Sequence, residues 1–195
     1  TNLIGTLNLL RSLENTDVKR IVLTSTIAVY GETGEEPVKE NHLLKPMTPY
    51  GFSKLCAEQY CRMWSENRGV RMISLRLSTV YGPRKTTGVV YNYLQRALSN
   101  QPLVVHGNGR QIRDFVYVDD VGDALLSCMT YAPPMTQTFN VSSQAPTTML
   151  DLVRHIETAI GKRATIQFKE RSGIEVLTMT SNSEKARRLL GFQPK

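Results

Sequence analysis

An alternation of short apolar runs with a long helical stripe constrains the fold of this chain more than any other feature. Residues 20–24 and 71–77 are short apolar runs, and residues 50–67 between them carry apolar side chains at helical spacing. Runs of this kind are typical of strands buried in a parallel sheet. Strands that alternate with helices across short linkers indicate a doubly wound sheet. We therefore predict an α/β protein built on a doubly wound parallel sheet.

The second half of the chain mixes shorter strands and helices, which predicts a smaller α/β lobe beside the sheet. The patterns predict further helices over residues 1–14, 89–98, 119–129, 147–160 and 182–191, and further strands over residues 103–105, 114–118, 138–141 and 165–168. We place the core in residues 1–83 and the lobe mainly in residues 84–195, with residues 114–143 returning to the core sheet.

The composition is that of an ordinary globular protein and argues against several classes of function. No apolar run reaches the roughly 18 residues of a membrane-spanning helix, and no signal-peptide pattern is present. The net charge of +7 comes from scattered basic residues without interleaved aromatics, so we expect no nucleic-acid partner. The three cysteines and three histidines lack metal-ligand spacing, so we expect no metal and a cytoplasmic protein with reduced thiols.

Tyr50 and Lys54 stand four residues apart at the start of the helix predicted over residues 50–67. Side chains at this spacing lie on one face of a helix, one turn apart. An ammonium so close favours the phenolate form of tyrosine, and a tyrosine tuned in this way can move protons at neutral pH. The alternative is a surface pair of the kind that many helices carry. A serine or threonine partner and a cofactor platform nearby would distinguish the two.

Four segments supply that context, in order along the chain. They are Thr24-Ser-Thr-Ile-Ala-Val-Tyr-Gly31, Tyr50-Gly-Phe-Ser-Lys54, Arg76-Leu-Ser-Thr-Val-Tyr-Gly-Pro83 and the stretch over residues 107–120. Together they resemble the extended short-chain dehydrogenase/reductase family, in particular its NAD-dependent, UDP-glucose 4-epimerase-like nucleotide-sugar epimerases and dehydratases. The resemblance covers essentially all 195 residues. It implies the C-terminal part of a Rossmann-like sheet with a smaller substrate-binding lobe.

The resemblance assigns roles to five residues around the reacting sugar carbon. Tyr50 would be the catalytic acid/base, and Lys54 would be its partner and would also bind the nicotinamide ribose. Thr26 would hydrogen-bond the reacting sugar hydroxyl, with the neighbouring Ser25 as a weaker candidate. The cofactor-binding residues would be Lys54, Tyr50, Ser25 and Tyr81, and Tyr81 lies in the turn that the family places beside the nicotinamide.

The resemblance also assigns a substrate-binding set: Thr26, Thr79, Val104, His106, Arg113, Arg171 and Glu175. Thr79 stands where the family often has asparagine. Arg113 matches the arginine that binds the nucleotide diphosphate, a group that a guanidinium can hold with two parallel hydrogen bonds. The alternative for Arg113 is a salt bridge to Asp114 or Asp119. Sugar specificity is expected to depend on the pocket around Thr26, Thr79 and residues 84–90.

The chemistry that the resemblance implies is epimerisation. Tyr50 would take a proton from a sugar hydroxyl while a hydride leaves to NAD, and the hydride would return to the other face of the ketone. Related dehydratases and decarboxylases carry acidic residues where this chain has Ile27-Ala28. The sequence therefore favours an epimerase over a dehydratase, and a dehydratase or reductase of the same family stays an alternative.

The glycine-rich motif that cradles a dinucleotide is absent from the sequence. The chain also begins inside a helical pattern without Met, so we expect an N-terminally truncated chain, with most of the NAD site in the missing half. The strand over residues 20–24 would then be an edge strand. Two functions stay open at this point: the epimerase, or an inactive remnant that acts as a nucleotide-sugar binding or protein-interaction module.

The resemblance implies partners as well. The substrate would be a UDP- or dTDP-sugar. The helices over residues 1–14 and 50–67 would join two copies of the chain into a homodimer, as they do in the family.

Overall fold

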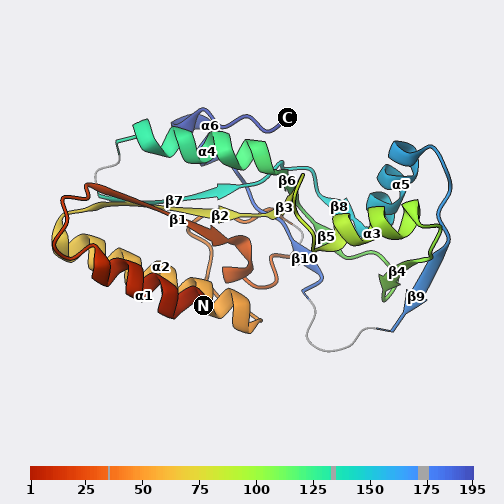
Figure 1. Cartoon of the computed structure of the whole chain (residues 1–195), viewed down its shortest axis with the longest axis horizontal. Helices are drawn as coiled ribbons and strands as arrows, with labels where there is room; N and C mark the ends of the chain where they lie inside the picture. The colour runs from red at the N-terminus through yellow and green to blue at the C-terminus, as the bar shows by residue number, and fades with distance from the viewer. Residues whose placement is uncertain (35, 133–134, 171–175) are drawn as a thin grey trace.

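Three parallel strands form the sheet at the centre of the larger part of the molecule (Figure 1). The computed structural model describes residues 1–34, 36–132, 135–170 and 176–195. The strands stand in the order β1 (Arg20–Thr26), β2 (Arg71–Leu77) and β7 (Thr136–Val141), each parallel to its neighbour. The predicted parallel α/β fold is confirmed. Among the described residues β1 pairs only with β2, so it is an edge strand here.

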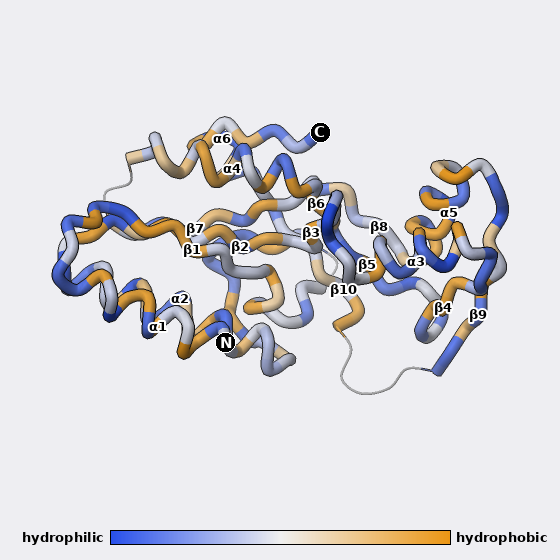
Figure 2. Tube along the Cα trace, in the orientation of Figure 1, coloured by the Kyte–Doolittle hydropathy of each residue, from blue (hydrophilic) through white to orange (hydrophobic). Residues whose placement is uncertain are grey.

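Helices cover both faces of this sheet. α1 (Asn2–Ser12) and α2 (Pro49–Arg68) lie on one face, and α4 (Val118–Thr130) and α6 (Glu184–Leu190) lie on the other (Figure 1). The alternation of side chains along β2 separates the two faces, since Met72 packs with α1 and α2 whereas Ile73 and Leu75 pack under α4 and α6. Figure 2 shows the apolar residues concentrated along the three strands.

The sequence of α2 explains where the helix begins and ends. The Thr48 side chain accepts a hydrogen bond from the Gly51 amide at 3.1 Å, and Pro49 occupies the first turn, where its missing N–H has no intrahelical role. Gly69 closes the helix at φ 64°, a left-handed conformation that glycine adopts without strain. The cap therefore fixes the first turn of α2, which carries Tyr50.

A smaller lobe lies beyond the carboxyl ends of the main strands (Figure 1). Its helices are α3 (Val89–Leu98) and α5 (Met149–Ile160), and its strand β4 (Leu103–His106) pairs with β9 (Ile166–Lys169). The pair of β3 (Thr79–Tyr81) and β6 (Phe115–Tyr117) joins the lobe to the main sheet, since Val116 packs in the cluster of the sheet and Phe115 in that of the lobe. A small sheet joins β10 (Thr178–Met179), β5 (Ile112–Arg113) and β8 (Thr147–Thr148). A buried apolar cluster with Tyr93, Leu103, Val105 and Val153 holds the lobe together.

The final helix, α6, was expected to belong to the lobe, but it packs on the main sheet. Ala186 and Leu190 of α6 lie in the same buried cluster as Ile73 and Phe139 of the main sheet. Residues of β6 and α4 join this cluster too. The division of the chain at residue 83 stays our proposal, with α6 assigned to the core. In the described ranges, no helix combines the length and apolar character needed to cross a membrane.

A buried polar network ties α2 to the sheet and to the segment after β1. The Arg76 guanidinium on β2 contacts the Glu58 carboxylate on α2 at 2.8 Å, with both side chains 5% exposed. Arg76 also donates to the Tyr30 hydroxyl at 2.9 Å, and that hydroxyl donates to Asn140 Oδ1 at 2.7 Å. Burial opposes the charge on Arg76, but the hydrogen bonds and charge of Glu58 outweigh it and raise the pKa of the guanidinium.

Replacement of Glu58 by alanine should destabilise the fold strongly, because Arg76 would keep a buried charge without its counter-ion. We expect Glu58→Ala to lower the free energy of unfolding by about 3–5 kcal/mol in urea titrations. Glu66 on the same helix pairs with Arg62 at the surface, so Glu66→Ala is the matched control, with an expected change within about 0.5 kcal/mol. Equal losses in the two variants would contradict this account of the buried pair.

Candidate active site

A cleft opens at the carboxyl ends of β1 and β2, where ligands bind in open parallel sheets. Its volume is about 410 Å³. The described residues that line it are Ser25, Thr26, Ile27, Ala28, Met47, Thr48, Tyr50, Leu77, Ser78, Thr79, Val80, Lys85, Val176 and Met179. The structure thus brings together Thr26 from the end of β1, Tyr50 from the start of α2 and Thr79 from the start of β3.

Tyr50 and Thr26 differ in how far they are exposed and in their hydrogen bonds. Tyr50 is 52% exposed and lies on the first turn of α2. The Thr26 side chain is mostly buried and accepts a hydrogen bond from the Ala28 amide at 3.2 Å, which caps the short 3-10 helix η1 (Ile27–Val29). Lys54, one turn after Tyr50, does not line the cleft, and its Nζ donates to the Thr24 carbonyl at 3.0 Å. That bond anchors α2 to the end of β1.

Two serine hydroxyls in this cleft lack a hydrogen-bond partner among the described residues. They are the Oγ atoms of Ser25, at the end of β1, and Ser78, directly after β2. A buried hydroxyl without a partner destabilises the fold, because it has lost its hydrogen bonds to water. Such groups therefore indicate a place where a ligand or water supplies the missing hydrogen bond. Ser25 was predicted as a cofactor contact. Ser78 was not, although it directly precedes Thr79.

Glycine allows α2 to approach the segment after β1 closely. A Cβ added at Gly51 would stand 2.6 Å from the Ala28 carbonyl oxygen, which is far inside van der Waals contact. A Cβ at Gly31, whose φ is 79°, would stand 2.2 Å from the Lys45 carbonyl oxygen. The approach of the first turn of α2 to the Ala28 carbonyl therefore depends on the absence of a side chain at Gly51, and the approach of the Lys45 carbonyl depends on its absence at Gly31.

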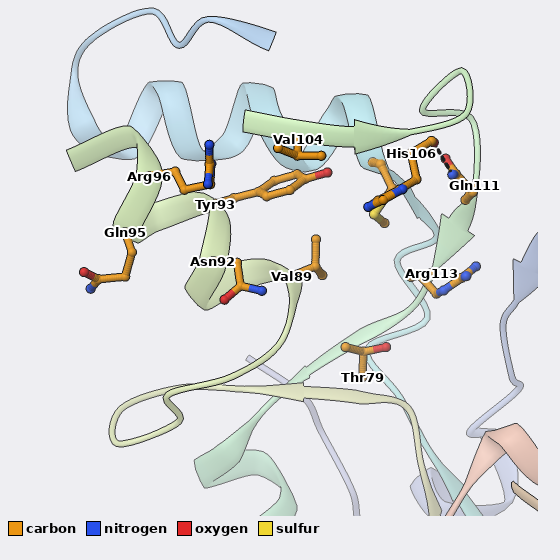
Figure 3. Close-up of a pocket in the computed structure, with 11 residues that line it drawn as sticks. Thr79, Val89, Asn92, Tyr93, Gln95, Arg96, Val104, His106, Gln111 and Arg113 are labelled. Atoms are coloured by element: carbon orange, nitrogen blue, oxygen red, sulfur yellow. Dashed lines mark hydrogen bonds between the residues drawn. The ribbon is translucent and has the colours of Figure 1, made fainter. Parts of the chain in front are cut away.

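A second cavity, of about 560 Å³, lies between α3 and the strands of the lobe (Figure 3). Four of the predicted substrate-binding residues line it: Thr79, Val104, His106 and Arg113. Figure 3 shows Val104 and His106 beside the Tyr93 ring, with Arg113 on the His106 side and Thr79 at the far end. The assigned roles stay predictions, but the structure does gather these residues around one cavity.

Backbone carbonyls hold the Arg113 guanidinium. It donates to the carbonyls of Ile112 at 2.8 Å, Val176 at 2.7 Å and Leu177 at 3.1 Å. The Asp114 carboxyl, considered as an alternative partner of Arg113, accepts a hydrogen bond from the Ser143 hydroxyl at 2.9 Å. Burial raises the pKa of this carboxyl. Backbone anchoring fixes the guanidinium at the edge of the second cavity.

Tyr81 lies outside the cleft that holds Tyr50. Its ring packs edge-on against Phe115 and Tyr117, with ring centroids 6.4 and 5.5 Å apart. It lines a third cavity, of about 320 Å³, between the turn after β3 and the start of α3. Thr79 lines all three cavities, so they meet at this side chain. The predicted pair Arg171 and Glu175 lies outside the described residues.

The chain matches the model of one protein family over most of its length. The NAD dependent epimerase/dehydratase family model covers residues 1–142. A putative UDP-glucose 4-epimerase of Methanocaldococcus jannaschii is 36% identical over 199 residues, which is 99% of this chain and 64% of that protein. An uncharacterized UDP-glucose epimerase of Bacillus subtilis is 31% identical over 187 residues, covering 95% of this chain and 59% of that protein. The chain thus spans about three fifths of these relatives.

Solved structures of nucleotide-sugar epimerases are also similar to this chain over its whole length. The UDP-glucuronic acid 4-epimerase of Bacillus cereus, in complex with UDP-glucuronic acid and NAD, has a TM-score of 0.94 at 29% identity, over 100% of this chain and 62% of that one. The UDP-glucose 4-epimerase of Thermotoga maritima with UDP-glucose has a TM-score of 0.93 at 31% identity, over 100% of this chain and 64% of that one.

A methyl group at Gly51 should push α2 away from the cleft. We expect Gly51→Ala to destabilise the protein by about 1–3 kcal/mol, because the backbone at Ala28 cannot yield as a flexible side chain can. A Cβ at Gly5 in α1 would meet no neighbouring atom within 4 Å, so Gly5→Ala is the control and should stabilise its helix by up to about 1 kcal/mol. Chemical denaturation measures both. A stabilised Gly51→Ala protein would refute the close approach.

Proposed function

The chain belongs to the NAD-dependent epimerase/dehydratase family, and on this premise we propose that it epimerises a nucleotide-diphosphate sugar with Tyr50 as the proton carrier. One observation carries the proposal: the Tyr50 cleft and the Arg113 cavity meet at Thr79. A ligand with a sugar at one end and a nucleoside at the other fits two cavities that meet in this way. The larger of the two, beside Tyr93 and Val104, would take the base.

The residues of the Tyr50 cleft fit a nicotinamide cofactor. The buried hydroxyls of Ser25 and Ser78 lack partners among the described residues, and Lys54 stands at the same edge of the sheet. We assign Ser25, Tyr50 and Lys54 to this cofactor, together with Tyr81, which lines the adjoining third cavity. When bound, NAD supplies the acceptor and donor for the hydride of the sugar carbon.

The chain's own residues would handle the proton and the position of the sugar. Tyr50 would accept the proton of the reacting hydroxyl and return it, and Thr26 would hold that hydroxyl by a hydrogen bond. Lys54 follows Tyr50 by one helical turn and donates to the Thr24 carbonyl, so it would hold the end of β1 beside the proton carrier. Arg113 would bind the diphosphate, and Val104 and His106 would contact the base.

The lining of the cleft favours an epimerase over a dehydratase of the family. Elimination of water from a sugar needs an acid and a base in addition to the tyrosine. Among the described residues that line the cleft, none is an aspartate or glutamate. Ile27 and Ala28, the positions where the related dehydratases carry acidic residues, both line the cleft with apolar side chains. A dehydratase of the same family is therefore the less favoured proposal.

A second candidate is a module that binds a nucleotide sugar without turnover. The sequence contains no glycine-rich dinucleotide motif, and such a motif supplies the contacts to the NAD pyrophosphate. The two candidates differ in one measurable property. An epimerase binds NAD and converts a UDP-hexose to its epimer, whereas the module binds UDP ligands alone.

We also propose that two copies associate through α1 and α2. Four large apolar side chains on these helices are exposed to solvent: Ile4, Leu9, Phe52 and Met63. The helices pack side by side on the outer face of the sheet (Figure 1), so a second copy would bury a joint surface. Exposed apolar area concentrated on neighbouring elements is a common mark of an interface.

Replacement of Tyr50 by phenylalanine tests the proton carrier. We expect Tyr50→Phe to lower the epimerisation rate with NAD by roughly 10²–10⁴-fold, because the phenol supplies the general base. Tyr60 is a similarly exposed tyrosine further along α2, so Tyr60→Phe is the control and should keep the wild-type rate.

Calorimetric titrations with NAD and with UDP distinguish the two candidate functions. The epimerase proposal expects wild-type protein to bind both. Binding of UDP without NAD binding or turnover would favour the module. Full turnover by Tyr50→Phe would show that the assigned proton carrier is wrong.

Sedimentation equilibrium tests the association of two copies. We expect a dimer for the wild-type chain and a monomer for the Ile4→Glu/Met63→Glu double variant, since two buried carboxylates per copy would oppose association. Leu126 is an exposed leucine on α4, on the other face of the sheet, so Leu126→Glu should remain dimeric. A wild-type monomer at all concentrations would disprove the interface.

A further inference from the structure

Lys85 differs in kind from every other residue of the Tyr50 cleft. Among the described residues that line the cleft, it is the single charged one, and the others are hydroxyl-bearing or apolar. We propose that Lys85 selects a sugar that carries a carboxylate, so that the preferred substrate class is a nucleotide-linked uronic acid. The inference rests on the proposed function, because it names the sugar at the same site.

The Lys85 side chain lies along the wall of the cleft. Its Nζ donates to the Val80 carbonyl at 2.6 Å. Its Cε and Nζ lie 3.3 and 3.6 Å from the position that a Cβ on Gly88 would occupy, so the side chain covers this glycine. The hydrogen bond and the contact at Gly88 both limit the freedom of the ammonium. They position it before a ligand arrives, which reduces the entropy lost on binding.

No side chain in the described part of the chain forms an ion pair with Lys85. An ammonium has three donors, and Val80 accepts one of them. A neutral hexose would bring only hydroxyls to the remaining donors. A carboxylate would bring a full opposite charge and strong, charge-assisted hydrogen bonds. The charge balance of the cleft therefore favours an anionic sugar over a neutral one.

The position of Lys85 assigns this anion to the sugar and not to the diphosphate. Lys85 lines the Tyr50 cleft and the third cavity, but it does not line the cavity that holds Arg113. With the reacting hydroxyl at Thr26 and Tyr50, and the nucleoside beyond Thr79, Lys85 is left facing another substituent of the sugar ring. A carboxylate at the carbon outside the ring, as in a uronic acid, matches that substituent.

Isothermal titration of this chain, with NAD present, tests the inference with three probes: UDP, UDP-glucose and UDP-glucuronate. We expect the wild-type chain to bind UDP-glucuronate more tightly than UDP-glucose. Lys85→Met should weaken the binding of UDP-glucuronate by roughly 10- to 100-fold and leave that of UDP and UDP-glucose unchanged. Lys85→Arg should retain most of the preference. Lys45→Met, at an exposed lysine that does not line the cleft, is the matched control and should behave as wild type.

The outcomes separate this inference from the function on which it rests. Equal weakening of all three probes by Lys85→Met would place the ammonium on the diphosphate and overturn the inference. An unchanged preference for UDP-glucuronate in Lys85→Met would overturn it too. In both cases the proposed function would stand, since UDP-sugars still bind. Failure of the wild-type chain to bind any of the three probes would overturn the proposed function and the inference together.

Discussion

The buried pair of Arg76 and Glu58 is the interaction on which the rest of this structure depends. Removal of two charges from water is costly, and the pair is retained only because its geometry and its further hydrogen bonds compensate. Arg76 uses the Tyr30 hydroxyl and the Glu40 carbonyl for its remaining donors. Through these bonds one guanidinium connects β2, α2 and the long segment that follows β1. Apolar packing alone would allow these elements to slide against one another.

The geometry of the candidate site depends on this network and on the close approach of segments that glycine allows. Thr26 ends β1 and Tyr50 begins α2, so their separation depends on how α2 docks against the sheet. Glu58 fixes that docking in the middle of the helix, and Gly51 allows the first turn to approach the Ala28 carbonyl. Lys54 adds a third anchor through the Thr24 carbonyl. Several constraints on one helix thus define one side of the cleft, whereas the lobe supplies the other side.

The sequence predicted the sheet and most helices, because periodic apolar patterns are local signals. The meeting of Thr26 with Tyr50 was implied by the family resemblance and not by such patterns. The sequence did not predict where Tyr81 lies, since the packing of its ring with Phe115 and Tyr117 depends on the pairing of β3 with β6. Ser78 was not assigned a role for a similar reason, and Lys85 was included only within residues 84–90, the range expected to shape sugar specificity. A residue lines a cleft through the path of loops, which is a tertiary property. The packing of α6 on the core sheet is likewise a long-range contact without a local signal.

Thr79 borders three cavities at once, so a single residue contributes to the walls that would contact both ends of a ligand. A short side chain on a backbone held by the Asp114 carbonyl at 2.9 Å offers little independent movement on either side. A substitution at position 79 would then alter the lining of all three cavities at once. Changes in nucleotide preference and in sugar preference would therefore arise together when position 79 varies, and evolution of one without the other would have to proceed through the outer walls of the cavities.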